Sequence, residues 1–145
     1  MIAYSTQRHG EPMKSYSSVV RLRLPLPPKE LSPNARIHWA QKARAAADYR
    51  LAAKVEGLNA KRASGLVVPL VTPVSMGLLF ILKDKRRHDL DNLLASIKSG
   101  LDGLVDAGLL ADDTAAVLRI DSLEARPQEP LEPACVHVTL TAAQG

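Results

Sequence analysis

The chain is poor in the residues on which several classes of protein depend. Cys135 is the single cysteine among 145 residues, so neither an internal disulfide nor a cysteine-based zinc cluster can form. The spacing of His38, His88 and His137, three of the four histidines, matches no zinc-binding motif. Together these absences predict a protein of a reducing, cytoplasmic compartment.

Long apolar runs are also missing. No stretch approaches the roughly 18 apolar residues that a membrane-spanning helix needs. Residues 1–17 are polar and lack the apolar core of a signal peptide. We expect this segment to be a loosely ordered tail and residues 18–145 to form one domain, which the length of the chain allows.

Aromatic residues make up only 3% of the chain, which disfavours binding of nucleic acid through bases stacked on aromatic side chains. The charge balance favours such a partner, because a formal net charge of +4 and a pI of about 9.4 suit a polyanion. Many small proteins are equally basic, so charge alone decides little. The hydrophobic fraction of 46% and the charged fraction of 23% are those of an ordinary globular protein.

Periodicity predicts the first elements of the fold. Residues 18–24 alternate between apolar side chains and arginines, the pattern of a half-buried strand, and the prolines of 25–34 end it. Residues 35–63 are predicted to be a helix that Gly57 ends early or weakens. Its apolar stripe, which an amphipathic helix turns to the core, consists of Trp39, Ala43, Ala47, Leu51, Val55 and Leu58. Its other side is rich in lysine and arginine and is either solvated or in contact with phosphate.

The second half of the chain predicts a strand, a helix and two further strands. The apolar run 74–82 predicts a largely buried strand. A leucine-rich helical pattern follows over about 90–107, with Gly108 as its C-terminal stop. Residues 116–125 and 134–142 predict two more strands. The inward-facing residues of the last strand are predicted to be Val136, Val138 and Leu140. The order β-α-β-α-β-β predicts an α/β (α+β) fold, a small mixed sheet packed with helices.

The segment "RRHDLDN" (86–92) joins opposite charges directly, and Asp89 and Asp91 flank the predicted start of the helix. Inside a helix, side chains two residues apart point roughly 200° away from each other and could not share an ion. They can converge if Asp89 is the N-cap and Asp91 lies in the first turn. The alternative is that both aspartates only cap the helix and complement its dipole.

A second acidic pair, Asp112 and Asp113, lies in the turn before the strand 116–125. If this strand lies beside the strand 74–82, the turn can return to the start of the helix, and three or four carboxylates meet. Packed carboxylates resist ionisation unless a cation neutralises them. Oxygen ligands without a cysteine or histidine cluster favour Mg²⁺ or Mn²⁺, and two such ions could activate a water against a phosphodiester.

Basic side chains accompany these acids. Lys98 lies seven residues after Asp91, two helical turns on, so both lie on the same helix face. It could contact a scissile phosphate or be a solvated lysine. The basic stretch before Asp89 could bind the phosphate backbone beside a cut or be a solvated loop that balances the acids. This stretch contains Lys83, Lys85, Arg86, Arg87 and His88.

These motifs resemble one known family. "KDKRRHDLDN", followed by a helix with "KSGLDGL" and then by "AGLLADD", is similar to the RusA-type Holliday junction resolvases, the crossover junction endodeoxyribonucleases of bacteria and their phages. The early segment "PLPP…SPN" resembles the proline and asparagine loop of that family. The resemblance runs from about Pro25 to the last strand.

The resemblance implies a metal-dependent endonuclease that nicks four-way DNA junctions symmetrically in recombination and repair, with Mg²⁺ or Mn²⁺ as cofactor. By motif, Asp89, Asp91 and Asp113 correspond to its metal-binding carboxylates, and Asp112 to a supporting one. Lys98, assigned through its neighbours "KSGLDGL", corresponds to its catalytic or DNA-contacting lysine.

The resemblance also implies a homodimer, since a two-fold axis suits paired cuts in a two-fold symmetric junction. The C-terminal strand and the proline-rich loop before it are candidate interface segments. In the early loop, Asn34 and Arg36 are candidate DNA contacts. Two other functions stay open: another metal-dependent nuclease of flaps or replication forks, and a DNA-binding or scaffolding protein without catalysis.

Overall fold

A mixed sheet forms the frame of the molecule. The computed structural model describes residues 18–142, so the tail predicted at residues 1–17 lies outside the described part. The strands are β1 (Val19–Leu24), β2 (Val74–Leu82), β3 (Leu118–Pro127) and β4 (Cys135–Ala142). Their order in the sheet is β1-β4-β2-β3. Strand β2 runs parallel to β3 and antiparallel to β4, and β4 runs antiparallel to β1.

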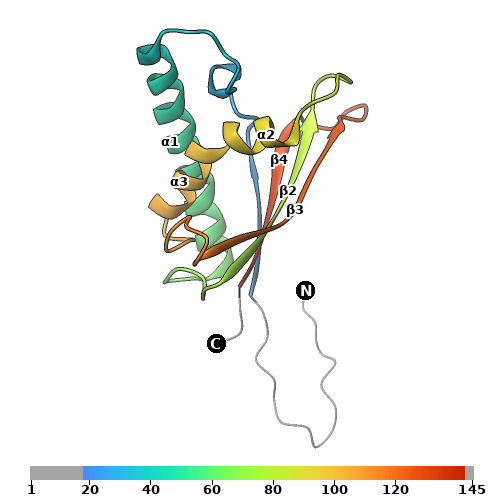
Figure 1. Cartoon of the computed structure of the whole chain (residues 1–145). Coiled ribbons are helices and arrows are strands. Elements are labelled where there is room, and N and C mark those ends of the chain that lie inside the picture. The colour runs from blue at the N-terminus through green and yellow to red at the C-terminus, as the bar shows by residue number, and fades with distance from the viewer. Residues whose placement is uncertain (1–17, 143–145) are drawn as a thin grey trace, which may run out of the picture.

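Helices cover one face of this sheet (Figure 1). They are α1 (Trp39–Ser64), α2 (Leu90–Ser96) and α3 (Lys98–Asp106), and a short 3₁₀ helix, η1 (Lys29–Leu31), precedes α1. Within residues 18–142 no helix covers the opposite face of the sheet. This arrangement confirms the predicted small α/β fold with a mixed sheet. The same described residues hold no helix both long and apolar enough to span a bilayer.

Alternation along the strands decides which side chains enter the core. In β1, Val20, Leu22 and Leu24 are buried, and Arg21 and Arg23 are exposed. This confirms the predicted half-buried strand, because successive side chains of a strand point to opposite faces of its sheet. The predicted inward-facing residues of β4 are likewise buried, namely Val136, Val138 and Leu140.

Helix α1 buries a different side from the one that its sequence predicts. The predicted core stripe is wrong, because its large members are exposed: Trp39 by 75%, Leu51 by 61%, Val55 by 48% and Leu58 by 38%. The buried residues of α1 are instead Tyr49, Ala53 and Gly57. The helix therefore turns its small residues toward its neighbours and leaves an apolar stripe in solvent.

The close approach of α3 explains this choice. A Cβ atom added at Gly103 of α3 would collide with the backbone of Arg50 and lie 2.8 Å from the Cβ of Ala53. A Cβ at Gly57 would lie 2.8 Å from that of Ala107. The prediction that Gly57 ends α1 is wrong, because the helix runs on to Ser64 and this glycine lets it pack at short range against Ala107 after α3.

The predicted second helix is divided in two. Ile97, with φ −93° and ψ −2°, ends α2 and precedes α3, and its side chain is fully buried. The predicted stop at Gly108 is confirmed, because this residue follows α3 with φ 81°, a conformation that favours glycine. The break redirects the chain, so α2 leaves the end of β2 and α3 runs beside α1 (Figure 1).

Candidate functional site

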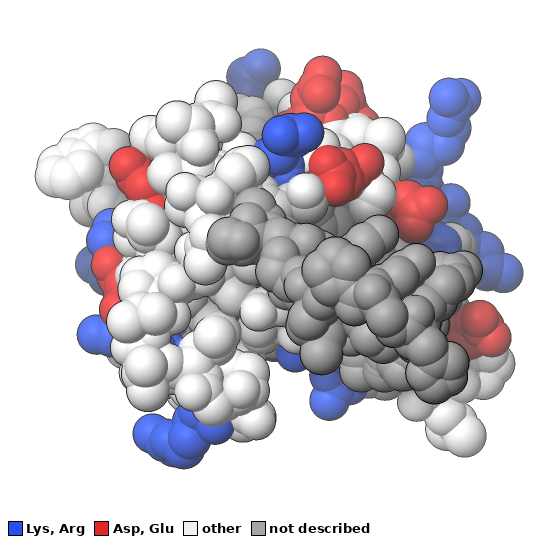
Figure 2. All heavy atoms as spheres, turned by 90° about the horizontal axis from the view of Figure 1, so that it is seen from below, with Lys and Arg blue, Asp and Glu red and all other residues white. Residues whose placement is uncertain are grey.

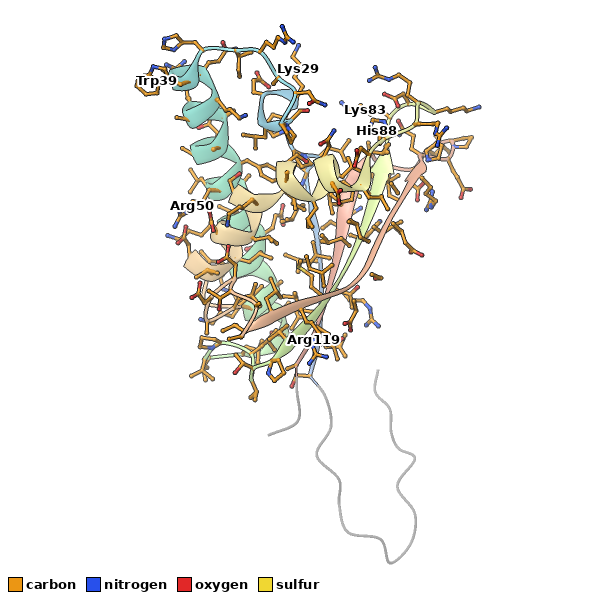
Figure 3. The ribbon with its side chains drawn as sticks, viewed as in Figure 1. Lys29, Trp39, Arg50, Lys83, His88 and Arg119 are labelled. Atoms are coloured by element: carbon orange, nitrogen blue, oxygen red, sulfur yellow. The ribbon has the colours of Figure 1, made fainter. Side chains whose placement is uncertain are left out.

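A groove of about 730 Å³ opens where β2 ends. It lies between the proline-rich loop around η1, the segment after β2 and the first turns of α2. Its apolar lining includes Phe80, Leu82 and Leu93. Its basic and amide lining residues are Lys29, Asn34, Lys83, Arg86, Arg87, His88 and Asn92. Figure 3 shows Lys29, Lys83 and His88 at this same end of the molecule.

The segment after β2 is organised by Asp84. One of its carboxylate oxygens accepts the backbone N–H of Arg86 at 3.1 Å and lies 2.9 Å from Nε2 of His88. The other accepts from Nε of Arg86 at 3.2 Å. The bond with His88, followed by those with Arg86, lowers the pKa of Asp84 to about 2. Asp84 is therefore an anion that holds two basic side chains of the groove in place.

Asp89 caps α2, as both of the predicted alternatives required. Its side chain accepts a hydrogen bond of 2.8 Å from the backbone N–H of Asp91, and its backbone is extended, with φ −77° and ψ 124°. Asp89 also lines the basic groove. Asp91 lies in the first helical turn, is exposed and is not among the residues that line the groove.

The second acidic pair meets Lys98. The ammonium Nζ of Lys98 donates to Oδ2 of Asp113 at 3.0 Å. The neighbouring carboxylate of Asp112 accepts the backbone N–H of Asp113 at 2.8 Å. Asp102, one helical turn after Lys98 in α3, is half-buried beside them. Lys98 is 70% exposed in its side chain and Asp113 is 20% exposed, so this pair lies at the surface.

The charged side chains of this cluster shift one another's pKa. The hydrogen bond with Lys98 lowers the pKa of Asp113, and the bond with Asp113 raises the pKa of Lys98. Burial raises the pKa of Asp102, and the negative charge of Asp113 adds to that rise while Lys98 opposes it. Lys98 thus favours the ionised form of Asp113, whereas burial favours the protonated form of Asp102.

The two acidic pairs were predicted to converge, and in this structure they do not. Among residues 18–142, no three aspartate, glutamate, histidine or cysteine side chains are grouped so that they could hold a metal ion. Strands β2 and β3 are parallel, so the turn with Asp113 enters the sheet beside the start of β2, where Val74 donates to the carbonyl of Val117 at 2.7 Å. Asp89 follows the opposite end of β2. The chain brings Lys98 to Asp113, because α2 and α3 run back from that end.

The predicted DNA-contacting residues divide into two groups. Most of them line the groove, namely Asn34, Lys83, Arg86, Arg87 and His88. Lys85 and Arg36 are exposed and do not line it. A loop side chain lines a groove only if the backbone directs it inward. The sequence of a basic run does not predict which of its side chains point inward.

Three residues of the site were missed from the sequence. Lys29 reaches the groove because the proline-rich loop lies against the end of β2. Asp84 stands four residues before His88, within reach across a turn, and that spacing was an available signal. Asp102 stands four residues after Lys98 in a predicted helix, a spacing that places two side chains on one face.

Acidic and basic side chains are interspersed on the surface. Figure 2 shows several acidic side chains in the upper part of the view from below, around a basic one, and further acidic side chains near basic ones at the left and lower right. A surface that bound polyanions over all of its area would not carry so many acidic side chains. The positive potential is therefore local, and the groove after β2 is one place where basic side chains cluster.

Comparison with known proteins adds one relative. No protein-family profile matches the chain. An uncharacterized protein of Xylella fastidiosa (strain Temecula1 / ATCC 700964) is 37% identical over 97 residues, which are 66% of this chain and 61% of that protein. The matched region thus covers less than two thirds of the relative, and its name assigns no activity.

Proposed function

We propose that this protein is a metal-dependent endodeoxyribonuclease that cuts branched DNA, with the four-way Holliday junction as its substrate. The observation that carries the proposal is the position of Asp89, a carboxylate that lines the same groove as Lys83, Arg86 and Arg87. Cations there would hold the phosphates of the DNA backbone, and the carboxylate would lie beside them. The resemblance of the acidic motifs to the RusA-type resolvases supports the same interpretation.

The donor atoms suit a hard divalent cation. Asp89, Asp91 and Asp113, supported by Asp112, would hold Mg²⁺ or Mn²⁺, because ions of this class prefer carboxylate oxygens. When bound, the ion would supply Lewis-acid stabilisation of charge on the phosphodiester. Asp113 lies apart from Asp89 and Asp91 in this structure, so assembly of this site requires the turn that carries Asp113 to leave Lys98 and to move toward the start of α2.

The remaining groups of the chain act on the DNA itself. Lys98, once released from Asp113, would place its ammonium against the scissile phosphate and offset charge that builds up there. Lys29 and Lys83 would hold the backbone across the groove, one from each wall. Two copies of the chain would deliver the paired cuts, each copy with one site.

The substitution Asp91→Asn tests the proposed function. It removes a charge with little change of shape, so we expect loss of cleavage of a synthetic four-way junction in Mg²⁺ by at least about 100-fold, with junction binding retained. The nicks are mapped over time with and without divalent metal. Asp48→Asn, at an exposed position of α1, is the matched control and keeps the parental rate. Cleavage by Asp91→Asn at the parental rate would disprove the assignment, and equal cutting of linear duplex would favour a less selective nuclease.

One observation favours a second function. Because the described acidic side chains do not form a metal-binding group, a DNA-binding protein without catalysis is the alternative. Titration calorimetry with Mn²⁺ separates the two. The nuclease proposal predicts binding that is lost in the double variant Asp89→Asn, Asp113→Asn. A chain that binds junction DNA but takes up no Mn²⁺ in either form would establish the alternative.

A further inference from the structure

A second cavity, which we call the tryptophan pocket, lies next to the basic groove. Its volume is about 450 Å³, which is in the range of cavities that hold small ligands. Its lining comes from the end of η1, the first turns of α1, the end of α2 and the start of α3. Ser96 of α2 lines both the groove and the tryptophan pocket, so the two cavities adjoin at the end of that helix.

The tryptophan pocket exists because α1 extends beyond the start of α3 (Figure 1). Where the two helices pack, a Cβ atom added at Gly100 would lie only 2.8 Å from the ring of Tyr49. Trp39 begins α1 ten residues before Tyr49, about 15 Å further along the helix axis. In the turns between them, the short side chains of Ala43 and Ala46 line the pocket and leave the space beside α1 open.

An exposed aromatic ring stands at the rim of this pocket. Trp39 is the single tryptophan of the chain and is 75% exposed at the start of α1 (Figure 3). The ring of His38 lies beside it, 5.5 Å away between centroids, and its Nδ1 accepts the backbone N–H of Ala40. An exposed indole offers a face on which a nucleobase can stack. The low aromatic content of the chain disfavours an extended stacking surface but allows a single platform.

Two ammonium groups flank the tryptophan pocket from different helices. Lys42 belongs to α1 and Lys98 to α3, and both line the pocket. No salt bridge between described residues involves Lys42. Lys98 donates to Asp113, but an ammonium carries three donors and this side chain is 70% exposed. Both lysines can therefore bind an anion that enters the pocket.

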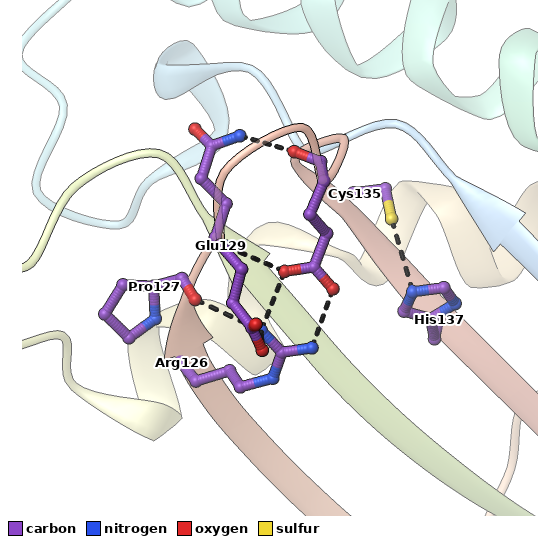
Figure 4. Close-up of polar contacts among 7 residues, drawn as sticks. Arg126, Pro127, Glu129, Cys135 and His137 are labelled. Atoms are coloured by element: carbon purple, nitrogen blue, oxygen red, sulfur yellow. Dashed lines mark hydrogen bonds and ion pairs between the residues drawn. The ribbon is translucent and has the colours of Figure 1, made fainter.

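Ser99 gives the tryptophan pocket a polar atom without a partner. Among the side chains of residues 18–142, its Oγ is the one buried polar atom that lacks a hydrogen bond. The neighbouring Ser96 differs, because its hydroxyl donates to the carbonyl of Leu93 at 2.7 Å. Arg126, at the end of β3, is also satisfied and donates to both carboxylate oxygens of Glu132 at 2.8 and 2.7 Å (Figure 4). An unpartnered buried hydroxyl favours a ligand that can bond with it.

We propose that the tryptophan pocket binds one unpaired nucleotide of the DNA substrate. The base stacks on Trp39, and its phosphate lies between the ammonium groups of Lys42 and Lys98. Ser99 and Asp102, which lie one turn apart in α3 and both line the pocket, bond with the polar edge of the base. This inference rests on the proposed function, in which Lys98 faces the scissile phosphate.

Stacking on Trp39 requires that the nucleotide be unpaired. In a duplex, neighbouring bases cover both faces of each base, so a paired base reaches the indole only after it has been unpaired and unstacked. That step costs free energy, and the cost is least for a base that is already single-stranded. The tryptophan pocket therefore selects DNA with an unpaired nucleotide, whereas the basic groove binds the phosphates of paired and unpaired strands alike.

The single tryptophan makes this binding directly measurable. The fluorescence of the full chain is titrated, with EDTA present to prevent cleavage, with a single strand of about six deoxycytidines, whose amino groups suit Asp102. We expect the emission of Trp39 to be quenched in proportion to binding. A strand of equal length with abasic sites in place of the bases should leave the emission nearly unchanged. Linear duplex should do the same at equal occupancy, which fluorescence anisotropy measures.

Substitutions in the tryptophan pocket separate stacking from a structural role. Trp39→Ala should weaken binding of the labelled single strand at least about fivefold, and Trp39→Phe should restore part of the loss. Ser99→Ala should weaken binding about threefold without lowering the melting temperature, because the hydroxyl has no partner within the described chain to lose. The matched control is Leu51→Ala, which removes a 61% exposed side chain of α1 outside the pocket lining and should bind like the parent chain.

The salt dependence tests the phosphate contact. Lys42→Gln should reduce the slope of log affinity against log salt by about 0.7 for the single strand. Arg44→Gln, at an exposed position of α1 outside the pocket lining, should leave that slope unchanged. Melting curves by circular dichroism verify that each variant is folded.

Four results would overturn the proposal. The abasic strand quenches as strongly as the intact one, Trp39→Ala binds the single strand as tightly as the parent, or linear duplex quenches equally at equal occupancy. The fourth is tighter binding of free deoxycytidine monophosphate than of the strand, which would assign the pocket to a free nucleotide. None of these measurements needs cleavage, and Asp91→Asn should keep the quenching. Loss of the nuclease proposal and loss of the tryptophan pocket are therefore separate results.

Discussion

The two consecutive short helices differ in their surroundings. Helix α3 packs tightly against α1, whereas α2 borders the open basic groove. Gly103 of α3 lies so close to the backbone of Arg50 that a methyl group does not fit. At the start of α2, Asp89 lines a groove of about 730 Å³ among exposed cations. The first region is closed by tight packing. The second is open to solvent, although Phe80 and Leu93 of its lining belong to the core or pack against it.

The substitution Gly103→Ala tests the packed contact between α1 and α3. We expect it to have the largest effect on stability of the substitutions considered. The added Cβ meets backbone atoms, which cannot retreat as a flexible side chain can. Overpacking of this kind destabilises a core by typically about 1–3 kcal/mol, here against a gain in helix propensity of about 1 kcal/mol. Because the collision is with backbone, the cost lies at the upper end of that range, and we expect a net loss of about 2 kcal/mol in the free energy of unfolding by urea.

Asn59→Ala, at an exposed position of α1, is the control and should stay within about 0.5 kcal/mol of the parent chain. A Gly103→Ala variant as stable as the parent would show that α1 and α3 are not in the close contact described.

The double variant Lys83→Gln, Arg87→Gln tests the basic groove beside α2. Both residues line the groove and are exposed, so stability should be unchanged within about 0.5 kcal/mol. Affinity for a four-way junction should fall about tenfold, and the slope of log affinity against log salt should decrease by about 0.9 per residue. Fluorescence anisotropy at several salt concentrations measures both. Arg44→Gln on α1 is the control, and an unchanged salt slope in the double variant would exclude the groove as the phosphate-binding surface.

Lys98→Met gives the smallest expected effect and sharpens the account of the acidic cluster. Without the ammonium, the pKa of Asp113 should rise toward its ordinary value, and the pKa of Asp102 should rise further, because Lys98 lowers both. Carboxyl carbon NMR titration measures these values. Lys85→Met, at an exposed position outside the groove lining, is the control.

The sign of the pH effect on stability follows from the lowered pKa of Asp113. Its bond with Lys98 stabilises the fold at pH values above the unfolded pKa of the aspartate, and this contribution is lost as the pH falls through the folded pKa. Lys98→Met should therefore lose less stability than the parent chain on acidification. Equal acid sensitivity of the two proteins would show that the ion pair contributes nothing measurable.

The sequence predicted the sheet more completely than the helices. Side chains of a strand alternate between its two faces. Because one face of β1 and of β4 is buried, their sequences alternate between apolar and polar residues, and Leu22 and Val138 are buried as expected. Helix α1 misled the same method, because apolar residues such as Leu51 form a stripe that no described element covers. Its buried side is made of Tyr49, Ala53 and Gly57, and the last two carry little hydrophobic signal.

The site was predicted in part. The cap at Asp89 could be predicted because its hydrogen bond joins residues two apart. The basic side chains of the groove after β2 could be predicted because most of them belong to one charged run in one loop. The contact of Lys98 with Asp113 joins residues 15 apart and depends on the break at Ile97 and on the parallel pairing of β2 and β3. No local pattern records such a contact.

By itself, the sequence determined the alternating strands, the helical segments, the cap at the start of α2 and the clustering of charge after β2. Each of these follows from interactions between residues close along the chain. Only the tertiary structure decided which side of α1 is buried and which carboxylate meets Lys98. Those outcomes depend on how closely two backbones can approach and on which strand ends lie together, and both are set by packing between segments far apart in the chain.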